Sequence, residues 1–148
     1  MPTQRNDPYL SFNFLVAIGD GDPGSVVGGF QDCSALGMEV GVVEYRNGNE
    51  RTNQVRKLPG LTRASDVVLR RGLVGSADLF AWIAEIRNGV LDRREVTITL
   101  LDEQRQPVMA WRLHRAWPSK WTAGPLHAKR NAVALEELTL VCESIDLE

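Results

Sequence analysis

Residues 94–116 read REVTITLLDEQRQPVMAWRLHRA, and this stretch decides the fold class. Apolar and polar side chains alternate on both sides of a polar turn at 102–106, which is the period-two pattern of half-buried strands. Two such strands joined by a short turn predict an antiparallel pair over 94–101 and 108–116. The apolar positions are Val96, Ile98 and Leu100 before the turn and Met109, Trp111 and Leu113 after it.

The same alternation recurs along the chain, so we expect seven or eight strands and a mainly β fold. Pro118 is expected to end the strand that begins at residue 108, because proline cannot donate a hydrogen bond to a neighbouring strand. The other expected strands cover residues 10–18, 25–31, 36–45, 66–70 and 132–142, with a short strand beginning near Trp121.

One segment, residues 76–88, has the pattern of a helix. Ser76 is a good N-cap, and Asp78 would place negative charge at the positive end of the helix dipole. Asn88-Gly89 supplies a C-terminal stop. The apolar positions at helical spacing are Leu79, Ile83 and Ile86, with Phe80 and Trp82 beside them.

Residues 46–63 are polar and are too many for a tight hairpin. They run from Arg46 to the turn Pro59-Gly60 and onward to Arg63. Loops longer than about 12 residues in compact domains are usually functional or disordered. We therefore expect this segment to be either a binding loop or a mobile surface loop.

The bulk properties favour an ordinary globular chain. Its 148 residues predict a single domain over 1–148, and a net charge of −2 does not indicate specific nucleic-acid binding. The polar residues 1–7 form no signal-peptide core, and no apolar run approaches the ~20 residues that a membrane helix needs. We expect a protein that is made in the cytoplasm and does not insert into membranes.

One stretch matches a nucleotide-binding motif. Gly19, Gly21 and Gly24 form G-x-G-x-x-G after a strand, but Asp20 and Asp22 would repel a pyrophosphate. Pro23 removes a backbone donor, and residues 25–31 lack the helical periodicity that a phosphate-binding helix N-terminus requires. We interpret the glycines as a hairpin turn, and we expect no cofactor.

No other residues form a catalytic or metal-binding pattern. His114 and His127 have no cysteine or carboxylate at ligand spacing, and no serine lies in a nucleophile elbow. Glu136 and Glu137 are adjacent on a strand and point to opposite faces, which favours an exposed edge or interface. Cys33 and Cys142 fit neither a metal nor a redox motif, and their pairing stays open. We expect that the protein is not an enzyme. Trp82 and Trp111 are predicted to be core residues.

A series of short motifs resembles the tail tube proteins of contractile phages and of phage-derived contractile injection systems. The motifs are Asp7-Pro8-Tyr9, Phe12-Asn13-Phe14, Gly29-Phe30, Glu44-Tyr45-Arg46-Asn47-Gly48, Lys57-Leu58-Pro59-Gly60, Leu69-Arg70-Arg71-Gly72, Trp82-Ile83, Arg93-Arg94, Ala116-Trp117-Pro118 and residues 131–141. The resemblance implies a two-sheet β-barrel or sandwich with one helix, an Hcp-like tail tube fold close to the inner-tube protein of type VI secretion.

The resemblance also implies an assembly function. Subunits would join edge to edge into hexameric rings, and the rings would stack into a rigid hollow tube inside a contractile sheath, with cargo or DNA in the lumen. The implied partners are other copies of the chain, the sheath protein, baseplate, spike and tube-initiator proteins, a terminator cap and luminal cargo. The chain would end in a phage tail or in a released or cell-associated injection particle. A tube-initiator paralogue and a ring-forming, cargo-binding secreted protein remain alternatives.

Three sets of residues receive roles by this resemblance. An N-terminal arm of Asp7, Pro8 and Tyr9 would contact a neighbouring subunit. A helix face with Asp78, Glu85 and Arg87 would meet the sheath. The segment from residue 45 to residue 60 would bridge to the next ring, and its candidate contact residues are Tyr45, Arg46, Asn47, Asn49, Arg51, Asn53, Arg56, Lys57, Pro59 and Gly60.

Overall fold

The computed structural model describes residues 5–19, 26–73 and 75–148. Within these ranges there are ten strands and one helix. In chain order they are β1 (Phe14–Ile18), β2 (Val26–Gly28), β3 (Asp32–Cys33), β4 (Met38–Tyr45), β5 (Arg56–Ala64), β6 (Val67–Gly72), α1 (Asp78–Arg87), β7 (Arg94–Leu101), β8 (Pro107–Ala123), β9 (Leu135–Val141) and β10 (Ser144–Leu147).

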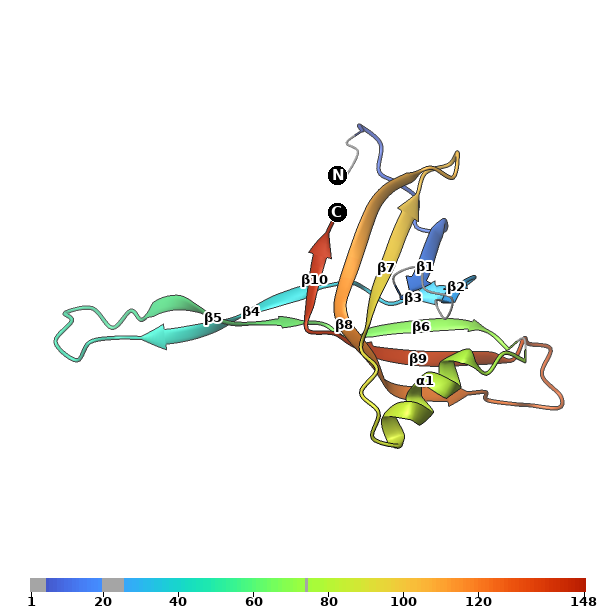
Figure 1. Cartoon of the computed structure of the whole chain (residues 1–148). Helices are drawn as coiled ribbons and strands as arrows, with labels where there is room; N and C mark the ends of the chain where they lie inside the picture. The colour runs from blue at the N-terminus through green and yellow to red at the C-terminus, as the bar shows by residue number, and fades with distance from the viewer. Residues whose placement is uncertain (1–4, 20–25, 74) are drawn as a thin grey trace.

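The body of the protein has two sheets that share strand β8 (Figure 1). In the first sheet β2, β1 and β7 lead to the first half of β8, whose other edge pairs with β10. In the second sheet the last part of β8 leads through β9 and β6 to β3. The expected mainly β fold with two sheets and one helix is confirmed, and the strand path does not close into a barrel within the described residues.

Strand β8 is continuous through Pro118, so the expected strand break there is wrong. Glu95 of β7 faces an extra residue of β8, because Arg94 pairs with Ala116 while Val96 pairs with Leu113. At this bulge Arg115 has a φ of 54°, a left-handed conformation that bends the strand from one sheet into the other. Pro118 tolerates its place because the ladder with β9 skips a residue just after it.

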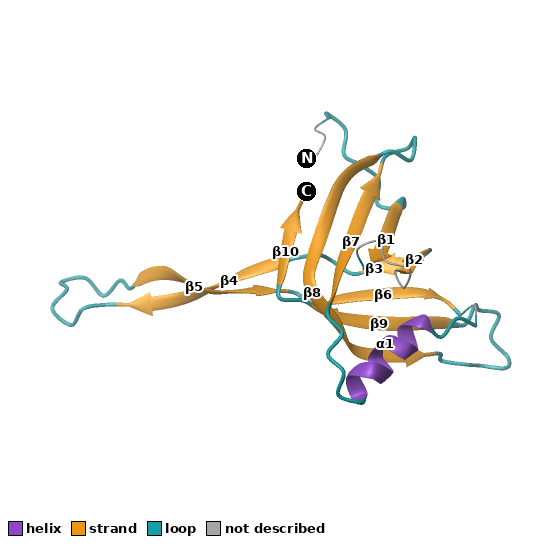
Figure 2. Ribbon diagram, in the orientation of Figure 1, coloured by secondary structure: helices purple, strands orange, loops and turns teal. Residues whose placement is uncertain are grey.

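Strands β4 and β5 form a separate two-stranded sheet that projects from the body (Figure 2). Their pairing runs from Met38 opposite Ala64 to Tyr45 opposite Arg56. Residues 56–63 are therefore strand, and the expected long loop is reduced to residues 46–55. Alternation did not reveal β5 because its side chains are exposed on both faces, so no buried side imposes a period of two.

The core lies between the two sheets and under helix α1. The helix buries Leu79 and Trp82, whose indole Nε1 donates to the carbonyl of Asp92 at 2.7 Å. Trp82 is therefore a core residue as predicted, whereas Trp111 is half-buried and packs against the core from its rim. The fully buried strand residues come from both sheets: Val16, Ile18, Val67, Leu69, Val96, Leu113, Ala116, Leu138 and Leu140.

Several expected element boundaries differ from the structure. Strand β1 begins at Phe14 rather than residue 10, and Leu10 and Phe12 are exposed. Helix α1 begins at Asp78 after Ala77, so Ser76 is not its N-cap, while Gly89 has the left-handed φ of 90° expected of the C-terminal stop. Strand β10 was not predicted. The G-x-G-x-x-G motif covers residues 19–24, and all of it except Gly19 lies outside the described ranges.

Candidate assembly interfaces

The β4–β5 hairpin exposes an unusual amount of apolar surface. Met38 and Val42 of β4 are each 65% exposed, and Leu61 of β5 is 91% exposed. Alternation along β4 places Met38, Val40 and Val42 on one face and Val43 and Tyr45 on the other, where Leu58 pairs with Val43. An isolated two-stranded hairpin is marginal in water, and exposed apolar patches of this kind mark interaction surfaces.

Polar contacts shape the tip of the hairpin. The Arg46 guanidinium donates to the carbonyls of Thr52 at 2.9 Å and Glu50 at 2.8 Å, so it holds the loop in place. Arg56 forms an ion pair with Glu50 at 3.3 Å, and the Tyr45 hydroxyl donates to Asn47.

The ten bridging candidates thus occupy different elements. The loop carries Arg46, Asn47, Asn49, Arg51 and Asn53, while Tyr45 ends β4 and Arg56, Lys57, Pro59 and Gly60 belong to β5. All but Arg46 and Gly60 are exposed.

The N-terminal arm is held against its own subunit. Arg5 donates to both carboxylate oxygens of Glu103, each at 2.9 Å, and to the carbonyls of Asp7 and Pro8, each at 2.8 Å. Its guanidinium also lies 4.1 Å from the ring centre of Tyr9. The hydrogen bonds from Arg5 lower the pKa of Glu103 to about 2. The arm residues Asp7 and Pro8 are exposed beside this contact.

The helix residues proposed to face a sheath do not form one surface. Glu85 and Arg87 are exposed, but Asp78 turns inward and pairs with Arg71 of β6. Burial raises the pKa of Asp78, but hydrogen bonds from Arg71, the Leu79 amide and Ser76 outweigh it, so the net pKa is lowered. Asp78 therefore anchors the helix to the second sheet.

A buried ionic network is centred on Arg71, and sequence reasoning missed it. Arg71 is 7% exposed and contacts the carboxylates of both Asp78 and Glu136. Glu136 is 2% exposed and also accepts a hydrogen bond from the Trp121 indole at 3.1 Å. Glu137 points to the opposite face and pairs with Arg70 at 2.9 Å. The expectation that Glu136 lies at an exposed edge is therefore wrong.

His114 connects three strands of the first sheet. Its Nδ1 lies 2.8 Å from Glu95 of β7, and its Nε2 lies 2.6 Å from Asp146 of β10. The hydrogen bond to Asp146 raises its pKa, with smaller contributions from Glu95 against a lowering by burial. The protonated imidazole thus helps to hold the C-terminal strand on β8.

The raised pKa predicts a pH dependence for β10. Stabilisation by His114 is complete below its unfolded pKa of about 6.5 and is lost as the pH rises through the higher folded pKa. Amide exchange in residues 144–147, corrected for intrinsic rates, is expected to show more protection at pH 6 than at pH 8.5. The His114→Gln variant should show no such difference. Equal pH dependence in both proteins would contradict this role of His114.

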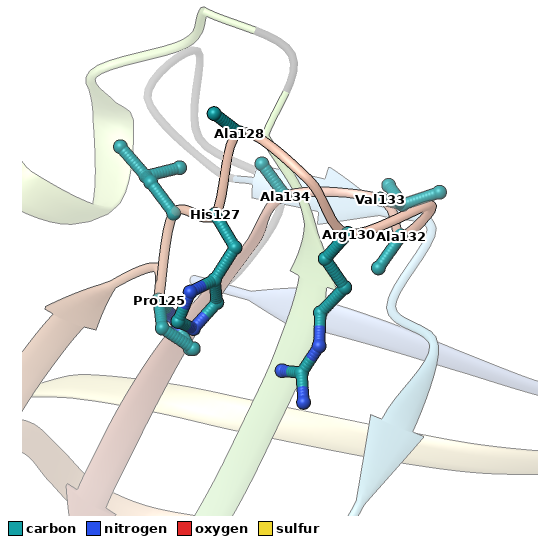
Figure 3. Close-up of a pocket in the computed structure, with 8 residues that line it drawn as sticks. Pro125, His127, Ala128, Arg130, Ala132, Val133 and Ala134 are labelled. Atoms are coloured by element: carbon teal, nitrogen blue, oxygen red, sulfur yellow. The ribbon is translucent and has the colours of Figure 1, made fainter.

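One groove lies in the loop between β8 and β9 (Figure 3). It has a volume of about 480 Å³, and His127 and Arg130 extend from the same side of the loop. The described residues that line it include no carboxylate, hydroxyl or thiol. Across the described ranges, no three His, Cys, Asp or Glu side chains gather as metal ligands, and Cys33 and Cys142 are free thiols. In the same residues no helix has the length and apolarity to span a membrane.

Comparison with known proteins gives a family match. The family described as T4-like virus tail tube protein gp19 matches residues 10–146. No curated protein matches the chain in sequence.

Solved structures of contractile particles contain similar chains. A chain in the cryo-EM structure of the anti-feeding prophage baseplate, 6-fold symmetrised, is 27% identical, with a TM-score of 0.85 over 97% of each chain. A chain in the sheath–tube complex of the extracellular contractile injection system PVC in the extended state is 26% identical, with a TM-score of 0.83 over 95% of this chain and 91% of that one. Hcp1 from Flavobacterium johnsoniae shares the fold at 12% identity, with a TM-score of 0.53 over 90% of this chain and 93% of Hcp1.

Proposed function

Because this chain belongs to the tail tube protein family of T4-like viruses, we propose that it is the inner tube subunit of a contractile injection system or phage tail. The observation that carries the proposal is the β4–β5 hairpin. It carries exposed apolar side chains on both faces and projects from the body, which does not cover it (Figure 2). Such a surface is stable only when another molecule covers it. The function is assembly, and the mechanism is passive conduction through a rigid tube.

The subunit would form hexameric rings that stack head to tail. Support for six-fold symmetry comes from the similar chain in the 6-fold symmetrised baseplate. A contact between two different patches gives a closed ring when the rotation from one subunit to the next returns to the first subunit, and an open filament when it does not. One subunit with two such contacts can therefore build both the ring and the tube. The hairpin residues 45–60 would bridge rings, and the arm residues Asp7, Pro8 and Tyr9 would contact a neighbour.

The partners of such a tube follow from the similar chains. These come from structures described as a sheath–tube complex, a sheath/tube terminator and a baseplate. A sheath protein, a terminator cap and baseplate proteins are therefore proposed partners, and cargo or DNA would occupy the lumen. Of the three helix residues assigned to a sheath contact, Glu85 and Arg87 are exposed and available to it. The chain would act without catalysis, first in the cytoplasm during assembly and then within the particle.

Negative-stain electron microscopy of the purified, concentrated chain tests the proposal. Six-fold rings stacked into hollow tubes are the expected result. Rings that never stack would favour a tube-initiator subunit at the baseplate. A monomer at every concentration, also in the presence of a matching sheath protein, would overturn the proposal.

Loss of the exposed cations at the hairpin is expected to weaken stacking. Arg51 and Arg56 lie at the tip, and replacing both by glutamine removes two charges from the proposed contact. Exposed ion pairs contribute about 0.2–1 kcal/mol each, so the loss of two should raise the concentration needed for tubes by about two- to thirtyfold. Sedimentation of tubes against protein concentration measures this change.

Lys129 and Arg130 provide the matched control for this variant, because they carry the same charge on the loop between β8 and β9. Their replacement by glutamine should change the required concentration little. Normal stacking by the Arg51→Gln/Arg56→Gln variant would show that these side chains do not bridge rings.

A further inference from the structure

We infer that an apolar groove beside strand β1 receives the β4–β5 hairpin of a second copy of this chain. The inference rests on the proposed function and names the surface that the hairpin contacts. The groove has a volume of about 320 Å³ and lies where the N-terminal segment, β3 and the first sheet meet. Its apolar walls are Leu10, Phe14, Leu36, Ile98, Leu100 and Trp111.

The groove is an open side of the core. Phe14, Leu36 and Trp111 pack against buried core residues from one side, yet they line a groove that is open to solvent. Leu10 at the rim of the groove is 48% exposed. Continuous apolar surface of this kind is favourable to cover, because burial removes it from water.

The hairpin is a two-stranded element of the described chain whose apolar side chains are left uncovered by its own subunit. It cannot fill the groove of its own subunit, because its tip points away from the body while β1 and β3 lie on the far side (Figure 1). A second copy can supply it. Val43, Tyr45 and Leu58 would then meet side chains of the same apolar character.

Charge selects this groove over the loop groove of Figure 3. Residues 38–64 contain five basic and three acidic residues, whereas the rest of the chain contains twelve basic and sixteen acidic residues. The loop of residues 124–134 carries His127, Lys129 and Arg130 and no acid, so it would repel the hairpin. No charged residue is among the described residues that line the apolar groove. Beside its wall residue Tyr9 lie the exposed carboxylate of Asp7 and the Arg5 guanidinium, whose charge is balanced by its ion pair with Glu103.

The two surfaces differ, and this determines the kind of assembly. The hairpin of one copy occupies the groove of the next, so each copy keeps a free hairpin at one end and a free groove at the other. A heterologous contact of this kind adds subunits without limit unless the rotation between successive subunits closes them into a ring. A groove-bound hairpin therefore links successive subunits in the manner that a tube requires.

Photo-crosslinking in assembled tubes tests the inference. The photoreactive residue p-benzoylphenylalanine replaces Tyr45, with Leu58 as a second position, and cross-linked peptides are identified by mass spectrometry. We expect cross-links to peptides that contain residues 9–14, 33–36 or 98–111. Cross-links to residues 124–134 or to another hairpin would overturn the inference while leaving tube assembly intact. If the unsubstituted protein forms no tubes with or without sheath protein, the proposed function itself fails.

A matched pair of variants gives an independent readout. Leu10→Asp places a charge in the groove and should raise the concentration needed for tubes at least tenfold, while circular dichroism of the dilute protein stays unchanged. Leu126→Asp places the same charge on a leucine of the loop groove that is exposed like Leu10, and it should assemble normally. Normal assembly of Leu10→Asp would overturn the inference.

Discussion

Replacing Val40 and Val42 together by aspartate is expected to leave folded subunits that form no tubes at any accessible concentration. Both side chains lie on one face of β4 and are exposed, so the body loses no packing. In an assembled tube each would be covered, and burial of an unpaired carboxylate costs several kcal/mol. Two such penalties per contact exceed what a stacking interface can offset. Electron microscopy and sedimentation at increasing concentration measure the loss.

The control for this variant carries the same two charges elsewhere. Leu126 and Val133 are also exposed apolar residues, but they lie in the loop between β8 and β9. Leu126→Asp/Val133→Asp is expected to form tubes. Tubes of normal appearance from Val40→Asp/Val42→Asp would show that this face of the hairpin stays in water within the assembly.

Arg71→Ala is expected to lower the free energy of unfolding by about 3–5 kcal/mol. The reason is that Glu136 and Asp78 would lose their shared cation, and Glu136 is too buried to be solvated instead. Urea denaturation followed by tryptophan fluorescence measures the change. It is best measured in the Val40→Asp/Val42→Asp background, where assembly does not add to stability.

Two further variants separate the network from general charge effects. Arg70 is the neighbour of Arg71 in sequence but forms an exposed pair with Glu137, so Arg70→Ala should cost much less stability than Arg71→Ala. The double variant Arg71→Leu/Glu136→Leu removes both buried charges and should recover much of the lost stability. If Arg70→Ala and Arg71→Ala cost the same, the buried network does not stabilise the fold.

The strands with one buried face could be predicted from sequence. In β7 and the first half of β8, alternation places Val96, Ile98 and Leu113 in the core, and the hydrophobic pattern reflects this directly. The core position of Trp82 and the helix end at Gly89 could likewise be predicted, because helical spacing and a glycine at the helix C-terminus are local signals. The family motifs gave the function, which alternation alone could not.

The remaining features depend on contacts between distant residues. Strand β5 has no buried face, so its sequence resembles a loop until β4 lies beside it. The pairing of Arg71 with Glu136 joins residues far apart in sequence, and adjacent glutamates gave no sign of which one turns inward. Pro118 lacks a backbone N–H and therefore predicts the end of a strand, yet the hydrogen-bond ladder with β9 skips a residue just after it and the strand continues. The groove arises only when the N-terminal segment meets Trp111.

The sharing of β8 between the sheets sets the order in which a chain leaving the ribosome can mature. Neither sheet has its common strand until residue 123 has emerged, and the first sheet gains its edge strand only with residues 144–147. The hairpin, residues 38–64, is made long before, and for most of translation no complete groove exists on the same chain. With the contact inferred above, a nascent chain therefore offers its hairpin well before it offers a complete groove, and this order delays joining between neighbouring chains on one messenger.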